Sequence, residues 1–313
     1  MQHTVQNIVT LCGVGLHSGA ETVLRIKPAV VSSGVVFVRV DVSGKNNVVP
    51  ARWDRVVDTR LCTVVGNEDG VTVGTIEHLM AALAACGVDN AVIELDGPEV
   101  PIMDGSSEPF IDAILDAGLS VQTAARRAIK ILKEVSVRDG DKIAVLTPGI
   151  GSRYSIEIDF SHPEIGRQSA EIDMFSGDFI GKIAEARTFG FLHEVNALRA
   201  MGLALGGSLD NAIVLDTDSV MNPEGLRCSN EFARHKVLDA VGDLYIAGGP
   251  IVGQFKASKP GHNMNNLVLR ELFSRPDSWA YVDLYMDHVP ETGVGIAVNS
   301  FVVSSVKSAI GAV

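Results

Sequence analysis

The sequence lacks the signatures of several large protein classes. It has four cysteines and no C-x-x-C pair among them, which argues against a thiolate zinc site or a dithiol redox motif. Its formal net charge is −12 and it contains no basic run, so the positive field that nucleic acid or an anionic membrane surface requires is missing. We therefore expect no nucleic-acid partner. A small anionic substrate is compatible with this charge only through a few locally placed Lys or Arg side chains.

Long apolar runs and targeting signals are also missing. Residues 1–7 have neither a cationic segment nor an apolar core, so they do not resemble a signal peptide. The most apolar stretch, residues 293–306, is interrupted by Asn299 and by serines and is too short to cross a bilayer. We expect a cytoplasmic protein with reduced thiols and no transmembrane segment. The sequence does not identify any protein partners, which stay unknown at this point.

The composition that remains is that of a globular chain. Of its 313 residues, 46% are hydrophobic and 20% are charged, and this length is comfortable for two domains. Residues 120–128 are polar and cationic without a clear period, as is typical of a linker. We therefore predict an N-terminal domain over residues 1–124 and a C-terminal domain over residues 129–313.

The order of predicted elements repeats between the two domains. A helix, a glycine stop and a strand occur at 76–95 and again at 231–256, and each pair is followed by a second helix, at about 107–118 and at 264–275. This order predicts an α+β fold made of two similar β-α-α-β domains. The domains would pack through their helices, with small antiparallel β sheets on the outside.

Other local signals predict where individual elements begin and end. Thr75 is the expected N-cap of the first of these helices, and Gly87 its C-terminal stop. Alternating residues predict strands at 58–65 and 129–137, the second of them paired with 142–147 in a hairpin.

A glycine-rich loop, residues 13–19, joins two predicted strands near the N-terminus. It resembles a phosphate-binding loop, but no helix follows it, so the resemblance is weak. His17 in this loop contacts either a ligand or water.

The predicted helix at 231–247 carries an unusual row of polar side chains. His235, Asp239 and Asp243 occur at i, i+4 and i+8, so they lie on one face of a mostly apolar helix. Burying such groups is costly unless something pairs with them, and a divalent metal ion would do so. Taken alone, a His-x-x-x-Asp pair is also typical of a solvated polar stripe or of a satisfied core histidine, and both alternatives stay open.

A second candidate pair, Glu77 and His78, occurs at the start of the first helix. A histidine ligand beside a glutamate is the layout in which the acid reaches the attacking water without binding the metal. The alternative is an acid that favours the helix dipole next to a half-exposed histidine. If the two domains pack through their helices, His78 meets His235 and Asp239. Two histidines and one carboxylate suit a hydrolytic zinc ion and also non-haem Fe(II).

Several short stretches have the order and spacing of one known family, from residue 7 to about residue 265. They are 13–19 (GVGLHSG), 58–63 (DTRLCT), 75–79 (TIEHL), 101–106 (PIMDGS), 186–191 (ARTFGF), 206–208 (GGS) and the helix at 234–244. Together they resemble the UDP-3-O-acyl-N-acetylglucosamine deacetylases, the zinc amidases of bacterial lipid A synthesis. The resemblance implies hydrolysis of the substrate's acetamide to acetate and a free amine, and adds an insert to each domain.

The resemblance also implies a role for each matching residue. His78, His235 and Asp239 match the ligands of Zn2+, and Fe2+ suits the same donors. Glu77 matches the general base, and His262 with its partner Asp243 matches the second acid. Thr188 and Lys236 match groups that stabilise the oxyanion. The sequence leaves open whether Glu77 alone moves the proton or His262 donates it.

The implied substrate is an acylated UDP-amino sugar, a small molecule with a diphosphate at one end and an acyl chain at the other. The insert at 188–209 would form an apolar passage for the chain, although such a pattern is also typical of an ordinary amphipathic helix. The predicted substrate contacts are Leu61, Cys62, Lys142, Phe189, Phe191, Gly207 and Ser208.

Two other functions stay open from the sequence. The first is a non-haem Fe(II) oxygenase, which uses the same donors but needs no base such as Glu77. The second is a non-catalytic protein that binds a sugar nucleotide or an acyl chain, with its histidines in the core.

Overall fold

The computed structural model describes residues 1–286 and 301–304. The strand predicted in the tail, 300–306, lies partly outside these residues; its described part is β20 (Phe301–Ser304), which pairs with β19 (Trp279–Met286). Residues 293–300 of the predicted apolar stretch also lie outside them. Over the described residues, every helix is too short or too polar to cross a bilayer.

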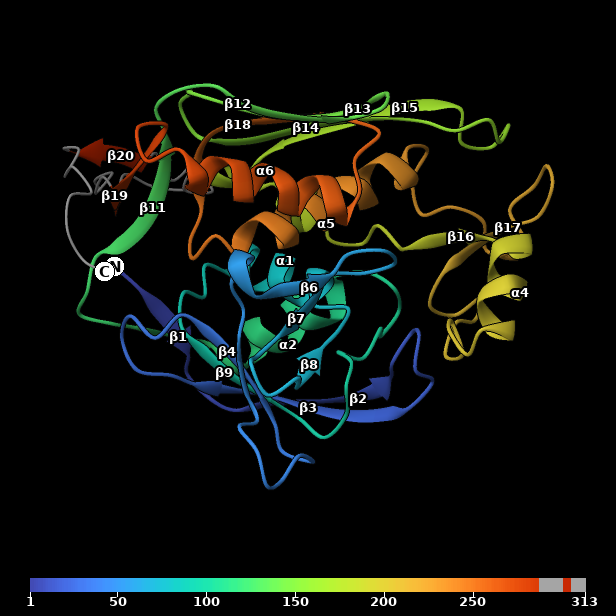
Figure 1. Ribbon diagram of the computed structural model, residues 1–313, viewed down its shortest axis with the longest axis horizontal. Coiled ribbons are helices and arrows are strands. Elements are labelled where there is room, and N and C mark those ends of the chain that lie inside the picture. The colour runs from blue at the N-terminus through green and yellow to red at the C-terminus, as the bar shows by residue number, and fades with distance from the viewer. Residues whose placement is uncertain (287–300, 305–313) are drawn as a thin grey trace, which may run out of the picture.

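Helices fill the middle of the molecule and sheets cover it on opposite sides (Figure 1). Helices α1 (Glu77–Cys86) and α2 (Glu108–Ala117) line the sheet of the N-terminal half. Helices α5 (Glu231–Tyr245) and α6 (His262–Ser274) line the sheet of the C-terminal half. The predicted α+β class is confirmed, and α1 packs directly on α5.

The N-terminal sheet is mixed. Its strand order is β2 (Val9–Val14), β3 (Glu21–Pro28), β9 (Ala91–Leu95), β4 (Val35–Arg39) and β5 (Val48–Pro50). β9 pairs antiparallel with β3 but parallel with β4. Two smaller sheets complete this half. In one, β1 (His3–Val5) pairs with β10 (Leu119–Val121); in the other, β7 (Val64–Gly66) lies between β6 (Val56–Asp58) and β8 (Thr72–Val73).

The C-terminal sheet is mixed as well. Its path runs through β12 (Val135–Asp139), β13 (Lys142–Thr147), β18 (Ile251–Ser258), β11 (Arg126–Ile131), β19 and β20, and β14 (Ser152–Asp159) joins β18 to β15 (Arg167–Asp173). β14 and β11 are parallel to β18, so the predicted all-antiparallel pairing is wrong. In sequence, β9 and β18 each lie between the two helices of their half, so the order is helix, strand, helix.

Shorter elements lie outside the two large sheets and the four central helices. A lobe made of β16 (Phe189–Phe191), α4 (Leu192–Ala200) and β17 (Ile213–Leu215) projects to one side in Figure 1. The residues of this lobe include most of the predicted insert at 188–209. η1 (Trp53–Arg55), η2 (Met174–Ser176) and α3 (Phe179–Lys182) are single turns.

Helices α1 and α5 are buried on nearly all sides, because each lies between its own sheet and the other helix. Leu79 and Leu83 of α1 and Leu238 of α5 are completely buried. The helices cross at Gly242, where an added Cβ would lie 1.9 Å from the carbonyl oxygen of Glu77. The two backbones therefore meet there without a side chain between them. Helix α1 ends as predicted at Gly87, whose φ is 72°.

Four local predictions differ from the structure. Thr75 is not an N-cap, because its φ is 54° and its hydroxyl donates to Glu99 at 2.7 Å; α1 begins after Ile76. The predicted strand 58–65 is a strand only at its ends, because its middle bends toward the helix interface. The predicted strand 129–137 is broken between β11 and β12. The predicted linker 120–128 includes the end of β10 and the start of β11.

Candidate metal and catalytic site

The helix crossing gathers the predicted chemical groups at one place. Glu77 and His78 come from the first turn of α1, His235 and Asp239 from successive turns of α5, and His262 from the first residue of α6. The first four are at most 4% exposed. Helix periodicity aligns the α5 pair, and the close approach at Gly242 brings α1 against it.

His78, His235 and Asp239 converge on a common point. The Nε2 atoms of the two histidines lie 3.6 and 3.3 Å from Oδ1 of Asp239, and their ring centroids are 5.0 Å apart. One donor atom from each residue lies within 4.8 Å of the others. Oδ1 of Asp239 is buried with no hydrogen-bond partner among the described residues, while Oδ2 accepts from Lys236 at 2.9 Å. Such an unpartnered oxygen facing two imidazoles fits a divalent cation.

The protonation states also fit a metal site. Nδ1 of His235 lies 3.0 Å from the carbonyl oxygen of Ala186, which only accepts, so Nδ1 carries the proton and Nε2 is free to bind a metal. Burial lowers the pKa of His235 to about 3, which keeps the ring neutral. Burial alone would raise the pKa of Asp239, but His235 and Lys236 hold it well below its usual range.

A second cluster lies beside the first and contains Glu77, Asp243 and His262. Nδ1 of His262 donates to Oδ2 of Asp243 at 2.8 Å, and its Nε2 lies 3.7 Å from Oε1 of Glu77. Thr63 joins the two acids: its backbone N–H donates to Glu77 at 3.0 Å, and its hydroxyl donates to Asp243 at 2.5 Å. Asn265 also donates to Asp243, at 2.9 Å.

The surroundings shift both proton-carrying groups. Burial raises the pKa of Glu77 to about 7, although the neighbouring His262 acts in the opposite direction. Burial alone would lower the pKa of His262, but the carboxylates of Asp243 and Glu77 raise it to about 10. At neutral pH the cluster therefore holds a carboxylate able to take a proton and an imidazolium able to give one.

A small cavity of about 90 Å3 opens onto both clusters. Its walls include five further predicted residues, namely Leu61, Cys62, Thr188, Phe189 and Lys236. Nζ of Lys236 lies 5.3 Å from the centre of the Phe189 ring. A larger cavity, of about 590 Å3, lies at the C-terminal ends of α1 and α5 and is lined by none of the predicted site residues.

Four predicted substrate contacts do not line the small cavity. Phe191 packs on Phe160, with ring centroids 6.0 Å apart, at the base of the side lobe. Gly207 lies against Leu16, and Ser208 donates its N–H to Asn211. Lys142 is exposed at the hairpin between β12 and β13. Their part in binding substrate stays a prediction.

Sequence reasoning assigned no definite role in the site to two further residues, His17 and Thr63. His17 lines the cavity, and both of its ring nitrogens are buried without a hydrogen-bond partner among the described residues. Its position is fixed because Glu99 accepts from the N–H groups of His17 and Ser18, both at 2.9 Å, and from Thr75. The only signal in the sequence was the glycine-rich loop itself. For Thr63 the only signal was its place in the family-like stretch 58–63, because its contacts depend on a bend between strands.

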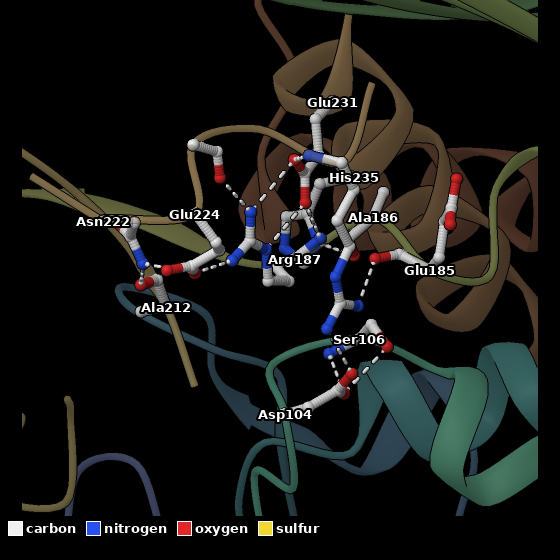
Figure 2. A network of polar contacts seen from close by, with 12 residues as sticks. Asp104, Ser106, Glu185, Ala186, Arg187, Ala212, Asn222, Glu224, Glu231 and His235 are labelled. Carbon is white, nitrogen blue, oxygen red and sulfur yellow. Dashed lines mark hydrogen bonds and ion pairs between the residues drawn. The ribbon is translucent and has the colours of Figure 1, made fainter. Parts of the chain in front are cut away.

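A polar network supports the side of the site next to the lobe. Figure 2 shows Arg187 between Glu224 and Glu231, with Ala186 and His235 beside them. Arg227 reaches across to the N-terminal half and donates to Asp104 at 2.9 Å. The hydroxyl of Ser107, in the same loop as Asp104, donates to the carbonyl of His78 at 2.9 Å. The loop at residues 104–107 therefore contacts the backbone of His78, and through Arg227 it also contacts the polar network beside His235.

Fold and site together define an α+β protein with a candidate divalent-metal centre next to an acid–base pair. The family model for UDP-3-O-acyl N-acetylglycosamine deacetylase matches residues 2–274. A UDP-3-O-acyl-N-acetylglucosamine deacetylase of Phenylobacterium zucineum is 53% identical over 278 residues, which cover 89% of this chain and 95% of that protein. Its namesake from Shewanella halifaxensis is 51% identical over 283 residues, covering 90% and 92%. The chain belongs to the UDP-3-O-acyl N-acetylglycosamine deacetylase family.

Proposed function

We propose that this chain hydrolyses the N-acetyl group of UDP-3-O-(hydroxyacyl)-N-acetylglucosamine to give acetate and the free amine, the committed step of lipid A synthesis. The observation that carries the proposal is the buried convergence of His78, His235 and Asp239 beside Glu77. The names of the related proteins support the substrate. A cytoplasmic location is part of the same proposal, since free cysteines suit that compartment.

We assign Zn2+ as the metal, with His78, His235 and Asp239 as its ligands. Two neutral imidazoles and one carboxylate are a common ligand set for hydrolytic zinc and leave a position open. When bound, the ion supplies Lewis acidity for the amide carbonyl and for the attacking water. Fe2+ suits the same donors, so metal analysis of the purified protein decides between the two.

Glu77 is the proposed general base. Its carboxylate is adjacent to the ligand His78 and faces the cavity, and the Thr63 N–H fixes its orientation. It takes the proton of the attacking water as the C–O bond forms. Lys236 and Thr188, on the cavity wall, stabilise the negative charge that develops on the amide oxygen; losing one such donor typically costs about 3 kcal/mol.

His262 is the proposed acid. Because Asp243 holds it cationic, its Nε2 carries a proton on the side that faces Glu77. That proton goes to the nitrogen of the leaving amine as the C–N bond breaks, and the acetyl group leaves as acetate. Asp243 acts through His262 and does not touch the reacting atoms.

The substrate's two ends extend away from the cavity. We propose that the insert at 188–209, most of which lies in the side lobe, holds the acyl chain, with Phe191, Gly207 and Ser208 along its path. Leu61, Cys62 and Phe189 would contact the sugar, and Lys236 and Lys142 the diphosphate. An aromatic ring at Phe189 and a cation at Lys236, 5.3 Å from it, suit such a ligand.

The decisive experiment is a deacetylation assay on the acylated sugar nucleotide, with the purified protein before and after chelation. We expect one equivalent of metal, loss of turnover on chelation and its return with Zn2+. Glu77→Gln should lower kcat by ~10^2 to 10^4-fold while the metal stays bound. The matched control is Glu171→Gln, an exposed residue on β15, which should leave kcat unchanged. Metal-dependent O2 consumption without acetate release would instead indicate the oxygenase.

A further inference from the structure

One peptide group lies between two residues of α5. The carbonyl of Ala186 accepts from Nδ1 of His235 at 3.0 Å, and the N–H of the same peptide, on Arg187, donates to Oε1 of Glu231 at 3.1 Å. Glu231 and His235 are one helical turn apart, so they grip the two ends of this peptide from one face of α5. We call this peptide group the 186–187 bridge.

Glu231 is completely buried, and its carboxylate forms an ion pair with Arg187. Its oxygens also accept from Nε of Arg187 at 2.9 Å and from the N–H of Arg227 at 2.6 Å. The guanidinium of Arg187 also donates hydrogen bonds to Glu224 and to the carbonyl of Gly225. Figure 2 shows how these groups close around Arg187 next to His235. Neither Glu231 nor Arg187 lines the cavity.

Burying a carboxylate and a guanidinium costs desolvation free energy, and an apolar pair of similar size would often be as stable. The presence of this pair beside a candidate metal ligand therefore points to a role other than stability. A carboxylate on the N–H of a peptide polarises that peptide and strengthens its carbonyl as an acceptor. The stronger acceptor fixes the imidazole ring, sets its tautomer and raises the basicity of the nitrogen that faces the metal.

We propose that Glu231 and Arg187 are positioning residues for His235, acting through the 186–187 bridge. Glu231 orients and polarises the bridge, and Arg187 holds Glu231 in place. The inference rests on the proposed function only in taking His235 as a metal ligand. The bridge also sets Thr188, the next residue, on the cavity wall.

The test is metal affinity, measured by competition of Co2+ and Zn2+ with a chromophoric chelator on the full chain. Glu231→Gln keeps an acceptor but removes the charge, and we expect metal affinity to fall 10- to 100-fold, as is typical when a partner of a metal-binding histidine is lost. Glu231→Asp, which keeps the charge but shortens its reach, should fall between Glu231→Gln and the wild type. If Glu231→Gln does not fold, Glu231→Asp provides the test by itself.

The matched control is Asp89→Asn. Asp89 is also a shielded acid that accepts from a backbone N–H, on His3 at 2.9 Å, and from an arginine Nε, on Arg126 at 2.8 Å. It lies by the C-terminal end of α1, away from the cavity. The control should lose thermal stability like Glu231→Gln but keep wild-type metal affinity.

The outcomes separate this inference from the proposed function. If both Glu231 variants bind metal within twofold of the wild type, the bridge has no such role and the inference is overturned. If the wild type binds metal but releases no acetate from the sugar nucleotide, the proposed function fails while the affinity comparison still decides the bridge. A movement of the His235 Nδ1 proton resonance in Glu231→Gln would support it independently of affinity.

Discussion

At the scale of single residues, one threonine, Thr63, contacts two acids of the proposed acid–base cluster. Thr63 is 1% exposed, and it holds Glu77 through its backbone and Asp243 through its hydroxyl. The two contacts differ in how they respond to substitution, because only the second requires the side chain. This difference allows the hydroxyl to be tested alone.

Thr63→Val should lower kcat by roughly 10- to 100-fold, because a hydrogen bond to a charged group is worth about 1.5–3 kcal/mol. Thr63→Ser keeps the hydroxyl and should retain most activity, and metal content should not change in either variant. Steady-state kinetics and metal analysis check this. Thr4→Val is the control, since Thr4 is also buried but accepts from Ala29 far from the site. Equal kcat losses in the Thr63 and Thr4 variants would contradict the idea.

Asp243→Asn should shift the pH dependence of kcat/KM. Apart from the opposing effect of burial, Asp243 is the largest influence on His262, whose pKa it raises toward about 10. As the proposed acid, His262 can donate a proton only below its pKa, so activity should fall as pH rises through that value. Removing the negative charge lowers the pKa by about 1–3 units, and the basic limb should move to lower pH by that amount. A pH profile with an unmoved basic limb would exclude His262 as the acid.

At the scale of elements, the loop between β9 and α2 joins the two halves at the site. The carbonyl of Gly105 accepts from the N–H of Thr188 at 2.8 Å, and the hydroxyl of Ser107 donates to His78. Gly105 has a φ of 87°, and a Cβ there would lie 2.2 Å from the carbonyl oxygen of Asn211. Only glycine fits this conformation and this space.

Gly105→Ala should therefore lower the free energy of unfolding by more than backbone strain alone would. Left-handed backbone costs a non-glycine residue about 1–2 kcal/mol, and here the clash with Asn211 adds to it. Gly70→Ala isolates the first effect, because Gly70 has a φ of 72° and open space around it. Denaturant unfolding of the two variants compares them. We expect Gly105→Ala to lose activity as well, since Thr188 moves with the loop.

The helices and the metal-ligand candidates could be predicted from the sequence, but the bends between strands could not. Helix periodicity placed His235 and Asp239 on one face of α5, and Gly87 marked the end of α1. The segment 59–63 alternates like a strand, yet it bends inward because its N–H and hydroxyl groups satisfy buried carboxylates. Such a tertiary demand leaves no local pattern. For the same reason, the sequence did not reveal Glu231, whose partners lie on other segments.

At the scale of the whole molecule, the candidate metal site is shared between the halves. His78 comes from one half, and His235 and Asp239 come from the other. Trp53 of the N-terminal half also stacks on Phe273 of α6, with centroids 4.6 Å apart. We propose domain limits of 1–124 and 129–313, because β10 pairs within the first half and β11 pairs within the second.

Metal removal should therefore lower the free energy of unfolding of the whole molecule as well as its activity. A ligand that binds only the folded state adds about 4 kcal/mol of stability at 1,000 times its Kd. Thermal unfolding with and without Zn2+ measures this gain, and we expect it to vanish in Asp239→Ala. An equal gain in Asp239→Ala would place the stabilising ion elsewhere.

The crossing of α1 and α5 at Gly242 has a consequence for mutational tolerance. Because backbone meets backbone there, no side chain is available to absorb changes in packing between the helices. Substitutions in the two outer sheets can change the free energy of unfolding while the spacing between His78 and the pair His235 and Asp239 stays the same. Any side chain acquired at position 242 would instead alter that spacing first.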